Sequence, residues 1–278
     1  MIIILRLLFI NLNRLALVTC LLLSTGLSAK ELKINTIDIF PFGYTSPDGQ
    51  ATGLIYEISN KIAQTAGFTF TNILAPYPRT IINLKNGNAD FVIRYTNAEL
   101  NKIAFPVASI ISFQTIIFGN KDGHFKSLKD LRGKTIGKIR GGIFDDHFEE
   151  DKEIEKYEVN DYDQLFKMLL AKRYDAIIGS SIGLYSNAKK MNISRKELGR
   201  PLHLQHKFFV LHLTKKNIDQ KTIEALKLAI HKLEANGEIL RIVKSYEESI
   251  LKKGDKGPKS SQQFNLLTSN DCNTCLKD

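Results

Sequence analysis

Three arginines stand at or just after apolar, strand-like segments of this sequence: Arg79, Arg94 and Arg140. Guanidinium groups form charge-assisted hydrogen bonds with carboxylates and other anions. An arginine in an otherwise apolar strand is costly to bury unless it is paired or lies at the edge of a cleft. Arg94 ends such a strand, in "ADFVIRY". We therefore predict that Arg94 contacts a small polar or anionic ligand.

Tyr77 and Arg79 lie in the segment "APYPRT", between a strand-like run and a helical one. An aromatic residue that opens a helix facing a cleft can stack on a ligand. Arg79 is close enough in sequence to reach the same cleft. A tyrosine of the core and a solvated arginine of the first helical turn are the alternatives. We predict that both residues bind the ligand.

Arg140, Gly141 and Gly142 end another strand-like segment and precede "IFDDHF". Glycine lets backbone N–H groups approach an anion closely, and the N-terminus of a following helix adds a favourable dipole. We predict that these three residues form an anion-binding loop. A tight turn without a ligand is the alternative.

Glu99 lies in "TNAE", residues 96–99, which has the pattern of a capping box. In that pattern Thr96 is the N-cap and Glu99 occupies N3 of the following helix. We therefore predict that Glu99 stabilises the start of a helix. The reverse, with Glu99 contacting the ligand, would point to a cationic solute.

Other groups of reactive side chains give weaker signals. His203 and His206 lie three residues apart, and no nearby cysteine or acid completes a metal site. Cys272 and Cys275 form a C-x-x-C pair without the βαβ context of a redox motif. No Ser-His-Asp, P-loop or HExxH arrangement is present. We predict no catalytic residue, no bound metal and no cofactor.

The elements that must position these residues alternate between strand-like and helical patterns. Such alternation is typical of parallel sheets in α/β proteins. The strand-like segments are 31–39, 68–75, 89–95, 110–119, 135–142, 174–181 and 207–214. The helical segments are 54–67, 79–88, 161–173 and a closing pair that divides at Asn236-Gly237.

The first 29 residues have the pattern of a secretory signal peptide: a basic start, a short apolar run and small residues at the exit. We expect cleavage near Ala29 and a periplasmic protein. Removing these residues takes two arginines and no acid, so the net charge falls from +10 to +8. The lysines are scattered and no aromatic-plus-basic motif appears, so no nucleic-acid partner is expected. Residues 251–278 lack periodicity and are predicted to form a flexible tail.

The order of motifs resembles the extracellular solute-binding proteins of family 3, which include the polar amino-acid receptors of ABC transporters. The likeness spans about residues 31–250. It is carried by "FPFGYTSPDGQATGLIYEI", "LKNGNADFVI", "SLKDLRGKTIGKIRGG", "LAKRYDAII" and "ALKLAIHKLEANGEILRIVKSY".

The resemblance implies an α/β, two-lobed periplasmic-binding-protein type II fold with two crossover hinge strands, near 113–121 and 207–214. Lobe 1 would comprise residues 30–117 and the closing helices, 213–250, and lobe 2 would comprise 118–212. The ligand would lie between the lobes, and hinge closure would trap it.

The chain departs from the family pattern at two ligand contacts. Many members carry T-P-E-R, whose arginine pairs with the ligand's α-carboxylate; here Glu99 takes that place, and Arg94 is the nearest cation. Asp163 aligns with a family aspartate that holds the ligand's ammonium, although it could instead share a helix N-cap with Asp161. A second acid usual after the following strand is replaced by a glycine. The ligand is therefore expected to be amino-acid-like without being a standard α-amino acid.

The implied function is capture of a small polar or anionic solute by a monomeric periplasmic protein. The protein would deliver that solute to an ABC permease in the inner membrane. A sensory protein of the same fold is the first alternative. An enzyme resembling cyclohexadienyl dehydratases, with Glu99 as its catalytic acid, is the second.

Overall fold

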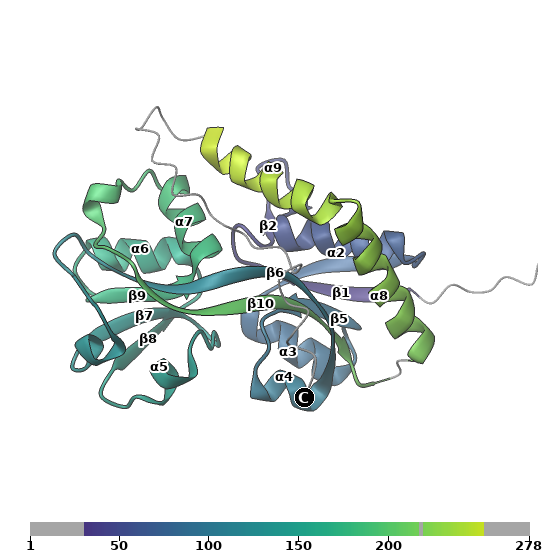
Figure 1. Cartoon of the computed structure of the whole chain (residues 1–278), viewed down its shortest axis with the longest axis horizontal. Helices are drawn as coiled ribbons and strands as arrows, with labels where there is room; N and C mark the ends of the chain where they lie inside the picture. Colours follow the sequence, from purple (N-terminus) through teal and green to yellow (C-terminus); the bar gives the residue numbers. More distant parts are fainter. Residues whose placement is uncertain (1–30, 217–218, 253–278) are drawn as a thin grey trace, which may run out of the picture. The chain divides into compact units, whose positions relative to one another are not determined.

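Two long strands, β6 (Ala104–Gly119) and β10 (Leu202–Thr214), lie side by side at the centre of an eight-stranded sheet (Figure 1). This arrangement comes from a computed structural model, which describes residues 31–216 and 219–252. The two strands are antiparallel, and their register shifts between His203 and His206, between Phe209 and Val210, and next to His212.

Shorter strands flank this central pair on both sides, in the order β4-β1-β5-β10-β6-β9-β7-β8. On one side, β1 pairs in parallel with β4 and β5; on the other, β7 pairs in parallel with β8 and β9. We call these the β1 end and the β9 end of the sheet. The β1 end comprises β1 (Leu32–Ile37), β4 (Phe70–Ala75) and β5 (Phe91–Arg94). The β9 end comprises β7 (Thr135–Ile139), β8 (Glu155–Val159) and β9 (Ala176–Ser180).

The same interaction sets the strand register at each end of the sheet. Asp90 donates its N–H to the Lys33 carbonyl at 2.6 Å, and its Oδ2 accepts from the Lys33 N–H at 2.8 Å. Asp175 makes the equivalent pair with Thr135, both at 2.9 Å. The two aspartates belong to the similar segments "NADFVI" and "RYDAII". Each therefore ties the start of one parallel strand to the start of its neighbour.

Three helices pack together beside the β1 end, namely α2 (Leu54–Thr65), α8 (Gln220–Ala235) and α9 (Glu238–Lys252). Helix α2 buries a stripe of apolar side chains that follows the helical period: Leu54, Ile55, Ile58, Ile62 and Ala63. The predicted division between the closing helices is confirmed at Gly237, whose φ is 73°. One continuous buried apolar cluster includes side chains of these helices and of strands at both ends of the sheet.

Three further helices begin directly after a strand. They are α3 (Tyr77–Asn86), α6 (Tyr162–Leu170) and α7 (Ser181–Lys190). Asp161 caps α6 by accepting from the Gln164 N–H at 2.7 Å. Ser180 caps α7 by accepting from the Gly183 N–H at 3.1 Å. These caps satisfy N–H groups that the helices leave unpaired at their starts.

The predicted capping box at 96–99 is wrong. The short helix α4 (Ala98–Ile103) has Asn97 as its N-cap, and the Asn97 Oδ1 accepts from the Leu100 N–H at 2.8 Å. Thr96 instead forms a 3.0 Å hydrogen bond from Oγ1 to the Nε2 of His212 on β10. Because β10 holds the Thr96 side chain, the cap falls one residue later, and Glu99 is left exposed in the first turn.

Several elements lie where no element was predicted from the sequence. They are α7, β8 and a small β2–β3 hairpin (Tyr44–Thr45 with Ala51–Thr52). Helices were expected after Thr96 and after Gly142, and α4 and α5 (Asp146–Glu150) lie there. The predicted signal peptide and the C-x-x-C pair lie outside the described residues, as does nearly all of the predicted tail. The predicted lobe boundaries stay a prediction.

None of the helices that the structure describes has the length and apolar character needed to span a membrane.

Candidate ligand-binding site

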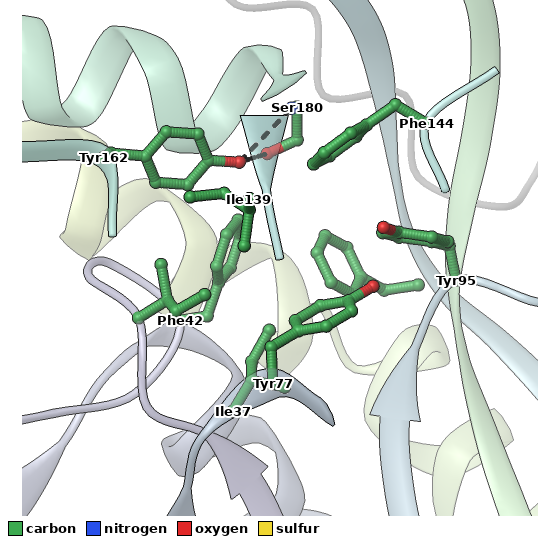
Figure 2. Close-up of a pocket in the computed structure, with 10 residues that line it drawn as sticks. Ile37, Phe42, Tyr77, Tyr95, Ile139, Phe144, Tyr162 and Ser180 are labelled. Atoms are coloured by element: carbon green, nitrogen blue, oxygen red, sulfur yellow. Dashed lines mark hydrogen bonds between the residues drawn. The ribbon is translucent and has the colours of Figure 1, made fainter. Parts of the chain in front are cut away.

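A small cavity lies among side chains from both ends of the sheet (Figure 2). Its volume is about 10 Å³, room for about one water molecule. It is lined by Ile37, Ile39, Phe42, Tyr77, Tyr95, Ile139, Phe144, Tyr162, Ser180 and Phe209. In this conformation the protein therefore fills the space between the two ends of its sheet with its own side chains.

Aromatic rings form most of the cavity wall. The Tyr95 ring lies 5.9 Å from that of Tyr77, 5.9 Å from that of Phe113 and 5.7 Å from that of Phe144, centroid to centroid. Phe113 in turn lies 4.9 Å from Phe209. All four ring pairs are tilted, an arrangement that aromatic pairs favour over a face-to-face stack. Such a wall suits a ligand with an aromatic or apolar body.

Tyr77 is the first residue of α3 and is buried in the cavity wall, where Figure 2 shows its ring. Burial raises the pKa of its hydroxyl, and the charge of Arg94 opposes that increase. The structure thus places the predicted stacking aromatic at the cavity. Its contact with a ligand stays a prediction.

Arg94, the last residue of β5, is completely buried behind Tyr77. Its guanidinium carbon lies 4.0 Å from the centroid of the Tyr77 ring. Its Nη1 donates to the Tyr77 carbonyl at 3.2 Å and to the Thr80 Oγ1 at 2.8 Å. Within the described residues, Nε and Nη2 have no hydrogen-bond partner and Arg94 has no ion pair. The structure therefore brings Tyr77 and Arg94 together and leaves two of the three guanidinium nitrogens unsatisfied.

Tyr95 joins the two ends of the sheet on the other side of the cavity. It follows β5, and its hydroxyl accepts from the Ile143 N–H, after β7, at 2.8 Å. Lys207 of β10 lies 5.4 Å above the Tyr95 ring and donates to the Ile143 carbonyl at 3.0 Å. Burial lowers the pKa of Lys207, while the carboxylates of Asp146 and Asp145 oppose that decrease. A second cation, which has protein partners, thus borders the aromatic wall.

Tyr162 and Ser180 supply the polar groups at the β9 end of the cavity. The Tyr162 hydroxyl lies 3.3 Å from the Ser180 Oγ, and burial raises its pKa to about 12. The ring fits against two glycines, because a Cβ would lie 2.7 Å from it at Gly179 and 2.5 Å from it at Gly183. The aromatic residue at the start of α6 therefore mirrors Tyr77 at the start of α3.

The predicted anion-binding loop is engaged with protein partners. The Gly142 N–H donates to the Ile139 carbonyl at 2.9 Å, and the Gly141 N–H donates to the Glu158 carboxylate at 3.3 Å. Arg140 is exposed, with its Nε 4.0 Å from Glu158. The helix that follows, α5, has only five residues. Binding of an anion here stays a prediction, and it would need these amides to change partners.

Gly141 nevertheless lies beside the cavity wall. Its φ is +69°, a conformation that favours glycine, and a Cβ built there would be 3.4 Å from Pro78 Cγ and 3.8 Å from Tyr77. The loop after β7 therefore approaches the start of α3 at Gly141, where a larger residue would press against Pro78.

Arg79 and Asp163 lie away from the cavity. Arg79 is exposed on α3. Asp163 forms an ion pair with Lys190, Oδ2 to Nζ at 3.0 Å, and borders a polar depression of about 450 Å³ that shares Ile39 and Tyr162 with the cavity. Asp38, Phe40 and Asn187 also line that depression. Of the predicted contacts, Tyr77 and Arg94 are thus close together, and Asp163 lies elsewhere.

Sequence reasoning did not identify Tyr95, Phe144, Tyr162 or Ser180 as part of the site. A signal for three of them was present in the sequence. Tyr95 and Ser180 stand at the ends of apolar strand segments, and Tyr162 opens a helix, as Tyr77 does. Among the described residues there is no group of three or more side chains that could hold a metal ion.

Residues 33–249 match the bacterial extracellular solute-binding proteins, family 3. The chain belongs to this family. The matched region covers both ends of the sheet and the helices that begin at the cavity, so the aromatic cavity lies within the family's common fold. Among curated proteins, no relative matches this solute-binding protein.

Solved structures share the fold at low sequence identity. A P235GK mutant of ArgBP from T. maritima is 18% identical, with a TM-score of 0.67 over 78% of this chain and 95% of that one. The substrate-binding protein of an amino acid ABC transporter is 19% identical, with a TM-score of 0.67 over 79% and 100%. A histidine kinase sensor domain similar to periplasmic binding proteins is 16% identical, with a TM-score of 0.69 over 78% and 96%. This solute-binding protein therefore has the type II periplasmic-binding-protein fold.

Proposed function

We propose that this protein captures a small polar or anionic solute in the aromatic cavity between the two ends of its sheet. It then delivers the solute to an ABC-type permease. The observation that carries the proposal is the composition of the cavity wall. Tyr77 and Tyr95 come from the β1 end, while Ile139, Tyr162 and Ser180 come from the β9 end. A cavity shared in this way changes volume when the two ends move apart.

Opening is a necessary part of this function. A volume of about 10 Å³ holds no solute larger than water, so the ligand enters a more open conformation. Hinge motion around a ligand is the usual movement of periplasmic binding proteins. β6 and β10 join the two ends, so we assign the bending to these strands.

Tyr77 and Arg94 are the ligand contacts that the geometry favours. Tyr77 offers a ring face, and Arg94 offers unsatisfied guanidinium N–H groups directly behind it. Contacts by Arg79, the loop 140–142 and Asp163 would require the open conformation, because these groups are exposed or already paired here.

We infer that binding occurs without catalysis. The proposed catalytic acid of the dehydratase-like alternative, Glu99, is exposed and does not line the cavity. None of the lining residues carries a carboxylate. Turnover of prephenate by the purified protein would contradict this inference.

We also propose that the protein acts as a monomer outside the cytoplasm after removal of residues 1–29. N-terminal sequencing of the mature protein should begin near Ala29 or Lys30. Truncation after Ile250 should leave affinity within a few fold. A loss above about tenfold, about 1.4 kcal/mol, would show that the tail contributes to binding.

Native mass spectrometry of gently purified protein tests solute capture directly, because a trapped ligand co-purifies. Tyr77→Ala should lose the bound mass, whereas Tyr157→Ala, which alters a half-exposed tyrosine on β8, should retain it. Small-angle scattering should then show a smaller radius of gyration for the wild type when the ligand is added back. Equal retention by both variants would contradict binding in the aromatic cavity.

A further inference from the structure

We propose that the ligand is an organic carboxylate with an aromatic or apolar body and without an ammonium group, and that Arg94 binds its carboxylate. This inference rests on the proposed binding function and specifies its substrate class. The inference rests on two observations among the described residues: Arg94 lies behind the cavity wall without an ion pair, and no carboxylate lines the wall.

The cavity wall has no carboxylate to pair with a cation, and the rings of Tyr77 and Tyr95 already lie beside Arg94 and Lys207. The lining side chains are aromatic or aliphatic apart from the hydroxyls of three tyrosines and Ser180. A buried ammonium group without a carboxylate partner carries a large desolvation cost. An α-amino acid would place such a group in this cavity, so the wall selects against amino acids.

Three acids near the site, Asp38, Asp145 and Asp163, do not line the cavity. Asp163 pairs with Lys190 in the polar depression, which shares Ile39 and Tyr162 with the cavity, and Asp38 is exposed at the same depression. Asp145 caps α5 by accepting from the Phe148 N–H at 2.9 Å. None of these three carboxylates lines the aromatic cavity.

The guanidinium of Arg94 presents a complete free edge. Nη1 is occupied by Tyr77 and Thr80, whereas Nε and Nη2 have no partner in the described part of the chain. Nε–H and Nη2–H lie on the same side of a guanidinium, so they can donate to both oxygens of one carboxylate. A buried charge of this kind is costly unless it is paired. A ligand carboxylate supplies the missing partner.

The residues around Arg94 leave its charge uncompensated. His212 is fully buried, and its pKa is lowered to about 4, first by burial and partly by Arg94, so it is neutral at pH 7. Thr80 and Thr96 contribute neutral hydroxyls. No carboxylate from β5, α3, α4 or β10 forms an ion pair with Arg94 among the described residues.

Tyr77 separates this charge from the cavity by one ring. The ring lies 4.0 Å from the guanidinium carbon and also forms part of the cavity wall. A shift of the Tyr77 side chain on opening would expose the free edge to a ligand. The apolar body of that ligand would then occupy the space among Phe42, Phe209 and Tyr162.

Matched pairs of probe compounds test the proposal. L-phenylalanine and 3-phenylpropanoate differ only in the ammonium group, and benzamide and benzoate differ in the charge of the head group. Calorimetric titration of the full-length mature protein should give at least about tenfold tighter binding for 3-phenylpropanoate and for benzoate within their pairs. Arg94→Met should abolish the preference for benzoate over benzamide, which Arg94 supplies. Arg94→Lys should retain part of it, because lysine keeps the charge and loses the forked geometry.

Lys207→Met is the matched control, since it removes the second cation near the wall, which already has partners. The Lys207→Met substitution should change the ratio of benzoate to benzamide affinity by less than about threefold. Tighter binding of L-phenylalanine, or undiminished preference in Arg94→Met, would overturn the proposal.

Two results separate this inference from the proposed function. A co-purified ligand that carries an ammonium group, or no carboxylate, overturns the substrate class and leaves solute capture standing. Absence of binding by all four probes, together with no co-purified ligand, counts against both. Circular dichroism of each variant shows whether a lost preference reflects lost folding.

Discussion

The side-chain amide of Asn187 donates a 2.9 Å hydrogen bond to the carbonyl oxygen of Phe40. Asn187 lies on α7, beside the β9 end, and Phe40 lies in the loop that follows β1. Lys190, one turn further along α7, lies 5.1 Å from the Phe40 ring. These contacts link the loop after β1 to α7 in this conformation.

Asn187→Ala should shift the ligand-free protein toward open conformations. The lost hydrogen bond is worth about 1 kcal/mol, which corresponds to about a fivefold change in the closed-to-open ratio. Small-angle scattering should show a larger radius of gyration, and ligand dissociation should be faster. Asn101→Ala, an exposed asparagine on α4, is the control and should leave both quantities unchanged.

Arg94→Met should leave the free energy of unfolding within about 1 kcal/mol of the wild type, since it removes a buried charge that lacks a counter-ion. Lys138→Met gives the contrast. Lys138 is buried and its Nζ lies 2.6 Å from Glu149 Oε1, so this variant breaks a pair and should lose about 3 kcal/mol. Urea unfolding measures both. A large loss for Arg94→Met would assign Arg94 a structural role.

Asn97→Ala should lower the free energy of unfolding by about 1 kcal/mol, the usual contribution of an N-cap. Glu99→Ala should have a smaller effect, because Glu99 contributes only a favourable charge near the start of α4. Urea unfolding of the two variants measures the difference. A larger loss of unfolding free energy for Glu99→Ala than for Asn97→Ala would instead support a capping box formed by Thr96 and Glu99.

Acid should destabilise the protein partly through His212. Its folded-state pKa of about 4 is below the unfolded value of 6.5, so the unfolded state binds the proton first. The stabilisation is present above pH 6.5 and is lost as the pH falls through 4, for a total of about 3 kcal/mol. His212→Gln should flatten the decrease between pH 7 and 4, measured by urea unfolding. His231→Gln, on the exposed face of α8, should keep it.

The alternation of apolar runs was enough to predict the α/β architecture, and the family resemblance implied the two strands that lie at its centre. Strands with continuous apolar centres, such as "DAIIG", and helices with regular stripes, such as α2, follow local rules. The elements that were not predicted are short or lack that regularity. The whole of helix α7 has the sequence "SIGLYSNAKK", in which glycine and serines obscure the helical period.

The site was harder to predict, because its members meet only in three dimensions. Arg94 was identified because an arginine in an apolar strand is unusual. Asp163 was identified by alignment alone, and the structure pairs it with Lys190. Thr96 was also misassigned for this reason: its hydrogen-bond partner, His212, is 116 residues away in the sequence, so no local pattern could reveal the contact.

The register shifts in β10 have a consequence for amide hydrogen exchange. A continuous ladder of hydrogen bonds opens as one unit, whereas an irregularity divides it into units with separate opening free energies. The shift between Phe209 and Val210 lies close to the cavity, because Phe209 lines it. Amides on the two sides of this point should therefore exchange at different rates. A ligand that closes the cavity should slow the segment 207–209 more than the segment 213–214, which pairs with the start of β6.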